Sequence, residues 1–102
     1  MSGLFCGTRV FNQPLSSWNV SNVKRMRDMF NYAEAFNQPL SSWDVSNVVH
    51  MSCMFANTRA FNQSLLSWNV RNGTNVRDIL FRAESFNQPL PSWISVEATD
   101  MV

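Results

Sequence analysis

The chain has 102 residues, of which 45% are hydrophobic and 13% aromatic, enough apolar material for one small folded domain but too few residues for two. Its formal net charge is +1, from 8 basic and 7 acidic residues, so charge gives no reason to expect nucleic acid or an anionic membrane as a partner. No apolar run approaches the roughly 18 residues that cross a bilayer. The first residues also lack the charged and apolar regions of a secretory signal.

A period of 25 residues is the main signal in the sequence. Phenylalanine, leucine and tryptophan all recur at that spacing, in and just after the segment Phe-Asn-Gln-Pro-Leu. The recurring positions are Phe11, Phe36, Phe61 and Phe86; Leu15, Leu40, Leu65 and Leu90; Trp18, Trp43, Trp68 and Trp93; and Met26, Met51, Val76 and Met101. We therefore predict one repeat domain over residues 1–102, with a partial coil at 1–10, full coils at 11–35, 36–60 and 61–85, and a partial coil at 86–102.

Each coil is expected to begin with a short strand. In the coil 11–35, Trp18 and Val20 alternate with polar neighbours, which is the pattern of a half-buried strand. Pro14 has no amide donor, so strand pairing should begin after it. In the last coil, Ile94 and Ser95 interrupt the pattern and put its strand in doubt.

A short helix is expected after the strand. Apolar residues in this segment are spaced by 3, 3, 1 and 3 positions, the stripe of an amphipathic helix, and Ser21 precedes them as an N-cap. The stripe consists of Val23, Met26, Met29, Phe30 and Ala33. In the third full coil Gly73 replaces the leading valine, so that helix should start later, near Asn75. Strand and helix in alternation predict a parallel solenoid, and the crossover rule favours a right-handed coil.

The motif Leu15-x-x-Trp18-x-Val20-x-x-Val23 has the spacing of the leucine-rich-repeat consensus. The fuller unit, best seen from Phe36 to Phe55, resembles the repeat of BspA-like leucine-rich-repeat surface proteins, above all the version found in bacterial surface lipoproteins. The expected fold class is therefore α/β, a right-handed leucine-rich-repeat-like solenoid with one short parallel strand and one short helix per 25-residue coil. The resemblance implies a surface-exposed interaction or structural role and no catalytic residues.

Most of the repeating side chains are predicted to be structural. The methionines (Met26, Met29, Met51 and Met54) and the tryptophans should form the core, with a tryptophan face exposed only in an end coil. The asparagine column (Asn12, Asn37, Asn62 and Asn87) and the glutamines beside it should form amide ladders between coils rather than a ligand site. The column of Arg9, Glu34, Arg59 and Glu84 alternates in charge, which predicts control of the stacking register.

The residues offer little for catalysis. His50 is the only histidine, and the three glycines form no phosphate-binding loop. Cys6 and Cys53 lie at different phases of the repeat, about two coils apart, so we expect free thiols. We predict that the protein is not an enzyme, with no catalytic, cofactor-binding or metal-ligating residues.

A binding face is predicted on the outward side of the strands. If Trp18 and Val20 point inward, the residues between them point outward and recur in the next coils. These residues are Ser17, Asn19, Ser21, Ser42, Asp44, Ser46, Ser67, Asn69 and Arg71, continued in the last coil by Ser92, Ile94 and Val96. The resemblance implies binding through this face, and the variation at positions 44, 69 and 71 would give discrimination. A merely solvated face is the alternative.

These observations predict a non-enzymatic repeat scaffold, a surface-type module that binds a protein or a glycan. The alternatives are a structural spacer or self-associating array whose uncapped ends join, and an intracellular repeat for protein–protein interaction. The resemblance implies a cell-surface or extracellular location. Because the chain shows no signal peptide, a cytoplasmic location is the alternative.

Overall fold

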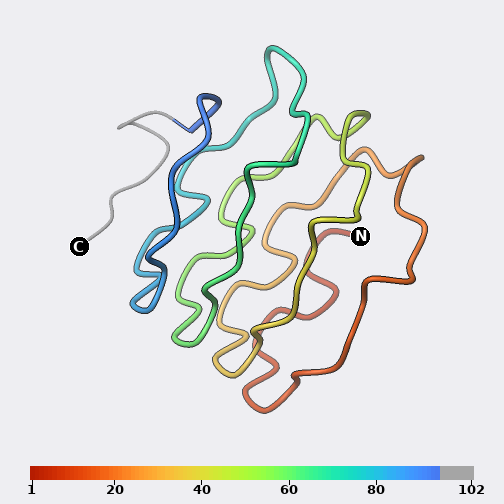
Figure 1. Ribbon diagram of the computed structural model, residues 1–102. Helices are drawn as coiled ribbons and strands as arrows, with labels where there is room; N and C mark the ends of the chain where they lie inside the picture. The colour runs from red at the N-terminus through yellow and green to blue at the C-terminus, as the bar shows by residue number, and fades with distance from the viewer. Residues whose placement is uncertain (95–102) are drawn as a thin grey trace.

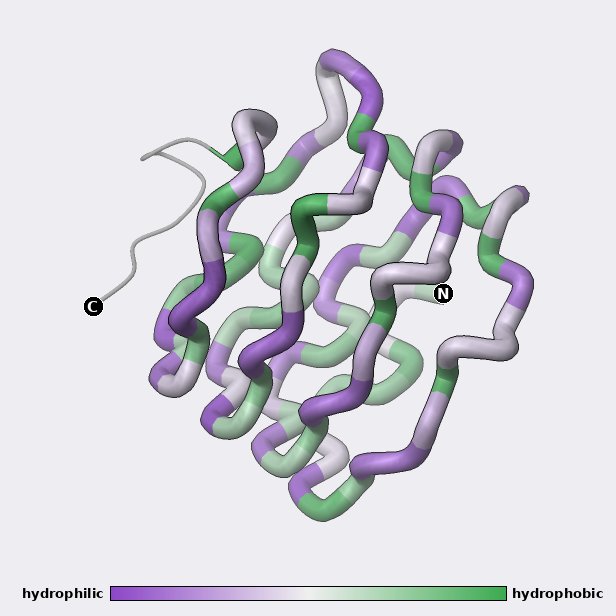
Figure 2. The backbone as a smooth tube through the Cα atoms, in the orientation of Figure 1, coloured by the Kyte–Doolittle hydropathy of each residue, from purple (hydrophilic) through white to green (hydrophobic). Residues whose placement is uncertain are grey.

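The computed structural model describes residues 1–94, in which successive repeats lie side by side in the order of the sequence (Figure 1). Hydrophobic residues take equivalent places in each repeat, as the colouring of the backbone in Figure 2 shows. We call this arrangement the stack. In the described part of the chain, no helix is long and apolar enough to cross a membrane.

Two columns of phenylalanine rings run along the stack. The rings of Phe30 and Phe55 are nearly parallel, with centroids 5.5 Å apart, and those of Phe36 and Phe61 are 6.1 Å apart. Within one repeat, the rings of Phe30 and Phe36 stack at 4.2 Å and join the two columns. Residues that share a phase of the repeat therefore pack on one another.

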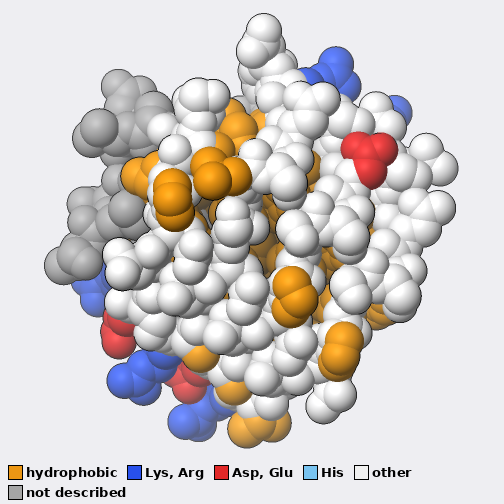
Figure 3. Space-filling model, in the orientation of Figure 1, with side chains coloured by type: hydrophobic (Ala, Val, Ile, Leu, Met, Phe, Trp, Pro, Cys, Tyr) orange, Lys and Arg blue, Asp and Glu red, His pale blue; other side chains and the backbone are white. Residues whose placement is uncertain are grey.

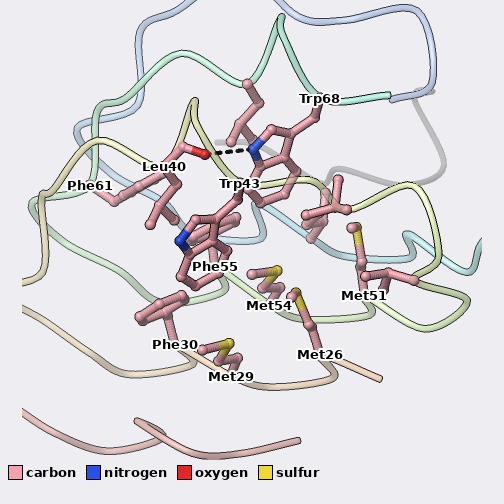
Figure 4. Close-up of a cluster of buried hydrophobic side chains, with 14 of the residues drawn as sticks. Met26, Met29, Phe30, Leu40, Trp43, Met51, Met54, Phe55, Phe61 and Trp68 are labelled. Atoms are coloured by element: carbon pink, nitrogen blue, oxygen red, sulfur yellow. Dashed lines mark hydrogen bonds between the residues drawn. The ribbon is translucent and has the colours of Figure 1, made fainter. Parts of the chain in front are cut away.

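The space beside the phenylalanine columns is filled by methionine and tryptophan. The side chains of Met26, Met29, Met51 and Met54 are fully buried and lie together below the indole rings (Figure 4). A flexible thioether fills irregular gaps of this kind well. The prediction that these methionines form core is confirmed.

The predicted α/β solenoid is wrong. Residues 1–94 contain no α-helix, and their β-structure is limited to two isolated parallel bridges, from Arg25 to His50 and from His50 to Asn75. These bridges lie at the start of the segments predicted to be helical and not in the predicted strands. With neither element present, the crossover argument for handedness has no basis. The described part of the chain is a compact body of irregular turns.

Left-handed backbone angles explain why the apolar stripe is not a helix. A helix needs φ near −63° at every residue, but φ is +57° at Asp28 and +63° at Tyr32. Both angles recur in each repeat. The first column is Gly3, Asp28, Cys53 and Asp78, and the second is Gly7, Tyr32, Asn57 and Arg82.

The backbone amides in this segment alternate between two kinds of partner. Phe30 N–H donates to the carbonyl of Met54 in the next repeat, 24 positions later. The amides of Met26, Asp28 and Tyr32 likewise donate to carbonyls 24 positions later. Met29 N–H instead donates to the carbonyl of Met26, three positions earlier, and the amides of Asn31 and Ala33 follow the same rule. The chain thus makes short turns whose apolar residues face inward, with the same spacing that suggested a helix. The buried stripe was predicted correctly and its conformation was not.

The predicted strands are also turns. Trp18 N–H donates to the carbonyl of Leu15 and Val23 N–H to that of Val20, each three positions back, and the second full repeat makes the same bonds. An amide committed to a local turn is not available for a strand ladder. Leu15 and Val20 are still buried, so the inward positions of the segment were predicted correctly.

The last repeat is displaced by one residue. Its turn closes from Ile94 N–H to the carbonyl of Pro91, one position later than in the earlier repeats. Ile94 is buried, and Leu90 is 45% exposed, although the equivalent leucines are buried. An apolar residue where the earlier repeats have Asn or Asp accounts for the shift, because burying Ile94 favours it. The predicted disturbance at Ile94 is confirmed; Ser95, Val96 and Met101 lie outside the described residues.

Candidate interaction surface

In the first two full repeats, the predicted binding face consists of turns whose polar groups hydrogen-bond to one another. Ser46 donates from its backbone N–H and its hydroxyl to Oδ1 of Asp44, at 3.0 and 2.6 Å. Asn19 and Ser21 make the same pair of bonds one repeat earlier. The Ser46 hydroxyl, followed by its backbone amide, lowers the pKa of Asp44. These side chains stabilise the turn, so one oxygen of each is already committed.

Serines of the predicted face also bond between repeats. The Ser42 hydroxyl donates to the carbonyl of Ser16 at 3.0 Å, and the Ser67 hydroxyl donates to that of Ser41 at 3.1 Å. The structure thus brings Ser42 and Ser67 into one column, as predicted. Their hydroxyl protons serve the stack and are not free for a partner.

The third full repeat breaks this pattern. Arg71 stands where the earlier repeats have Ser21 and Ser46, so no serine hydroxyl is present to bond Asn69. Asn69, Arg71 and the neighbouring Asn72 are exposed. Of the nine predicted face residues, Asn69 and Arg71 are the ones that depart from the pattern of the earlier turns.

A hollow of about 490 Å³ lies beside these residues, between the third and fourth repeats. The fourth repeat contributes Pro91, Ser92 and Trp93 to its wall. The third repeat contributes Leu66, Trp68, Asn69, Val70 and Asn72. No charged side chain is among these residues, and Figure 3 shows hydrophobic side chains gathered over the last two repeats. We call this feature the junction hollow.

The tryptophans differ between the junction hollow and the interior of the stack. The indole Nε1–H of Trp43 donates to the carbonyl of Leu15, and that of Trp68 to the carbonyl of Leu40, both at 2.9 Å (Figure 4). Trp93 stacks on Trp68 with centroids 6.4 Å apart, but its Nε1 is buried and has no hydrogen-bond partner. The one-residue displacement of the last turn accounts for the lost bond. At the other end of the stack Trp18 is 38% exposed, the tryptophan face predicted for an end coil.

The departures from the repeat contain a sequence signal for the junction hollow. Leu66 replaces a serine of the repeat, Pro91 replaces another, and Ile94 replaces a polar residue. These departures from the repeat cluster in space at one junction. The predicted face included Asn69 and Ser92 of this hollow but missed Leu66, Val70, Asn72, Pro91 and Trp93. Pro91 and Trp93 lie in a repeat whose displacement the period does not reveal.

A family model described as DUF285, a Mycoplasma protein of unknown function, matches residues 1–101. The chain belongs to this family. Neither the curated proteins nor the solved structures include one that matches the chain. The match supports the prediction of a repeat protein, and it does not single out BspA-like leucine-rich repeats.

The asparagine column of this DUF285 chain is structural. Asn37 Oδ1 accepts the backbone N–H of Asn62 and the amide Nε2–H of Gln63, both at 2.9 Å. Asn12 and Asn62 accept the same pair of bonds from the repeats that follow them. The predicted amide ladder is confirmed.

The alternating charge column is confirmed in part. Arg9 pairs with Glu34 at 3.4 Å and Arg59 with Glu84 at 3.8 Å, so ion pairs join neighbouring repeats on this edge. No ion pair joins Glu34 to Arg59, both of which the structure describes. The pairs are largely exposed, and each contributes about 0–1 kcal/mol.

The two cysteines are free thiols, as predicted. Desolvation, followed by the charges of Asp28 and Asp78, raises the pKa of Cys53, which therefore stays protonated near neutral pH. Within residues 1–94, no group of three His, Cys, Asp or Glu side chains could hold a metal ion.

Proposed function

We propose that this chain is a non-enzymatic repeat scaffold that contacts another macromolecule through the junction hollow and the exposed edge beside it. One observation carries the proposal. Among residues 1–94, polar groups that are satisfied within the stack in earlier repeats have no such partners at this junction. Trp93 Nε1 is buried and unpaired there, and Asn69 lacks the serine that bonds Asn19 and Asp44.

The chemistry of the surface supports binding rather than catalysis. The junction hollow combines apolar side chains with amide groups, a mixture that is typical of binding sites. The raised pKa of Cys53 argues against a nucleophilic thiolate. The resemblance of the Phe36–Phe55 unit to BspA-like surface proteins supports a cell-surface role and a protein or glycan as the partner.

The test is binding to immobilised mucin, which offers both protein and sugar, measured by surface plasmon resonance. Leu66 is 54% exposed at the junction hollow, so Leu66→Asp adds a charge there without emptying the core. Val10→Asp adds the same charge at a side chain that is 90% exposed outside the hollow. We expect Leu66→Asp to weaken binding at least tenfold and Val10→Asp to leave it unchanged. Equal binding by both variants, or no binding by the wild type, would reject the proposal.

Self-association is the second candidate, and exposed apolar groups in the first repeats favour it. Leu4 and Trp18 are exposed, although the equivalent side chains of the interior repeats are buried in the core. Sedimentation velocity at several concentrations tests this candidate. An increase in mass with concentration that Trp18→Ser abolishes would support it, and a constant monomer mass would exclude it.

A further inference from the structure

The third full repeat differs from the earlier ones in the turn that contains Asn72 and Gly73. Asn72 is the only asparagine in the sequence that is followed by a glycine. We propose that Asn72 is a site of spontaneous deamidation, at which the backbone nitrogen of Gly73 displaces the side-chain amide as ammonia. Three features of the turn lead to this site: the side-chain amide, the backbone nitrogen and the space around the glycine. The proposal is independent of the proposed function.

The side-chain amide of Asn72 is exposed and makes no hydrogen bond within residues 1–94. In the preceding repeat, Asn47 has the same phase, and its Nδ2 donates to the carbonyl of Ser21 at 2.7 Å. Such a bond from an asparagine side chain to the backbone holds the amide in one orientation. The amide that would leave is therefore restrained at Asn47 but not at Asn72.

The backbone nitrogen after the asparagine also differs between repeats. Val48 N–H donates to the carbonyl of Val45 at 3.0 Å, and the first full repeat makes the same bond. In the third full repeat the turn closes one residue later, where Thr74 N–H donates to the carbonyl of Arg71 at 3.3 Å. This change leaves Gly73 N–H without a hydrogen bond within residues 1–94. Its nitrogen can turn toward the asparagine side chain without breaking a bond.

The space around Gly73 is open. A β-branched valine follows both Asn22 and Asn47, and its stiff side chain crowds the nitrogen. Gly73 is exposed, and even an added Cβ would meet no atom within 4 Å. Its φ of +84° is an angle that glycine adopts without strain in the third position of a turn. The peptide unit therefore has room to rotate as the ring forms.

The reaction needs only water as a co-reactant. The Gly73 nitrogen gives its proton to solvent and bonds to Cγ of Asn72, while the Cγ–Nδ2 bond breaks and Nδ2 takes up a proton and leaves as ammonia. Water then adds to one of the two carbonyl carbons of the five-membered imide. Opening at Cγ gives aspartate, and opening at the backbone carbonyl gives isoaspartate. No atom is oxidised or reduced.

The products change the junction between the third and fourth repeats. A carboxylate at position 72 lowers the formal net charge of the chain from +1 to 0. It also places an anion at the junction hollow, which no charged side chain lines. Isoaspartate adds a carbon atom to the backbone of the turn, so the bond from Thr74 to Arg71 loses its geometry.

The experiment incubates the intact chain in mildly alkaline buffer and follows each asparagine by peptide mapping with mass spectrometry. Asn22 and Asn47 are internal controls, because both share the phase of Asn72 and are exposed. We expect Asn72 to convert at least tenfold faster than either control, and faster still as the pH rises, since the attacking nitrogen must lose a proton. A smaller difference would overturn the proposal.

The products test the route through the imide. We expect isoaspartate at position 72, detected by its methylation by an isoaspartyl methyltransferase, and no conversion in Asn72→Gln, whose longer side chain does not form the five-membered ring. Conversion to aspartate without isoaspartate would mean direct hydrolysis and would reject attack by Gly73.

The same mapping in urea separates the contribution of the turn from that of the Asn-Gly pair. In the unfolded chain the pair alone sets the rate. Because the turn leaves both reacting groups unrestrained, we expect the folded chain to convert Asn72 within tenfold of the unfolded rate. A folded rate lower by more than tenfold would show that the turn protects Asn72 and would contradict the proposal.

Discussion

The carbonyls of Leu15 and Leu40 each accept two hydrogen bonds. The carbonyl of Leu40 accepts the backbone N–H of Trp43 in its own repeat and the indole N–H of Trp68 in the next. A carbonyl oxygen has two lone pairs, and both are used here. One residue thereby ties a local turn to the neighbouring repeat.

The first residue-scale prediction compares two tryptophans. Trp68→Phe keeps an aromatic ring but loses the bond to Leu40, whereas Trp93→Phe loses no bond. We expect Trp68→Phe to lower the free energy of unfolding by about 1 kcal/mol more than Trp93→Phe, the net value of a typical hydrogen bond. Urea denaturation measures both variants. Equal losses would mean that the indole bond contributes nothing.

The second residue-scale prediction concerns Asn37. Asn37→Ala leaves the backbone N–H of Asn62 and the amide of Gln63 without their acceptor, whereas Asn37→Asp retains an oxygen at that place. We expect the alanine variant to lose about 1–3 kcal/mol of stability and the aspartate variant clearly less. Thermal and urea unfolding at neutral pH provide the comparison. The reverse order of stability would contradict the amide ladder.

Among the elements, the apolar segment of each repeat is held by backbone amides that donate in turn to the next repeat and to a carbonyl three positions earlier, and not by the hydrogen bonds of a helix. Its two left-handed positions per repeat are taken by glycine in the first repeat but by Asp28 and Tyr32 in the next. A left-handed angle costs roughly 1–2 kcal/mol at a residue with a side chain, and aspartate tolerates it better than most. Tyr32 is therefore the more strained of the two.

This strain gives an element-scale prediction. Tyr32→Gly should be more stable than Tyr32→Ala by about 1 kcal/mol, the opposite of the order expected within a helix. Gly7 provides the converse test, because a methyl group there meets no atom within 4 Å and only the angle of +76° opposes it. Gly7→Ala should thus be destabilising. If alanine is the better residue at position 32, the segment is helical and the angles are wrong.

Periodicity predicted which residues of an element are buried but not its conformation. A spacing of 3, 3, 1 and 3 fits a helix, and it fits consecutive turns equally well when every second amide bonds to another repeat. Single-sequence patterns record the direction of side chains and not the sign of φ. The left-handed angles at Asp28 and Tyr32 could not be predicted from residue type, since neither residue is a glycine. The junction hollow was partly missed because the displacement of Ile94 depends on packing between repeats.

At the scale of the whole molecule, stability comes from contacts between neighbouring repeats. Phenylalanine columns, amide ladders and backbone bonds all join residues about one period apart. In such an arrangement each repeat is stabilised by its neighbours rather than by its own elements. A repeat that departs from the common sequence therefore alters its junction, as the third and fourth repeats do.

Alternate amides of the apolar stripe bond to the next repeat and not within a helix. Through-hydrogen-bond NMR couplings between amide nitrogens and carbonyl carbons test this pattern directly. We predict couplings from Phe30 N to the Met54 carbonyl and from Phe55 N to the Ile79 carbonyl, each 24 positions apart. Couplings from these amides to carbonyls four positions earlier would show α-helices and contradict the account.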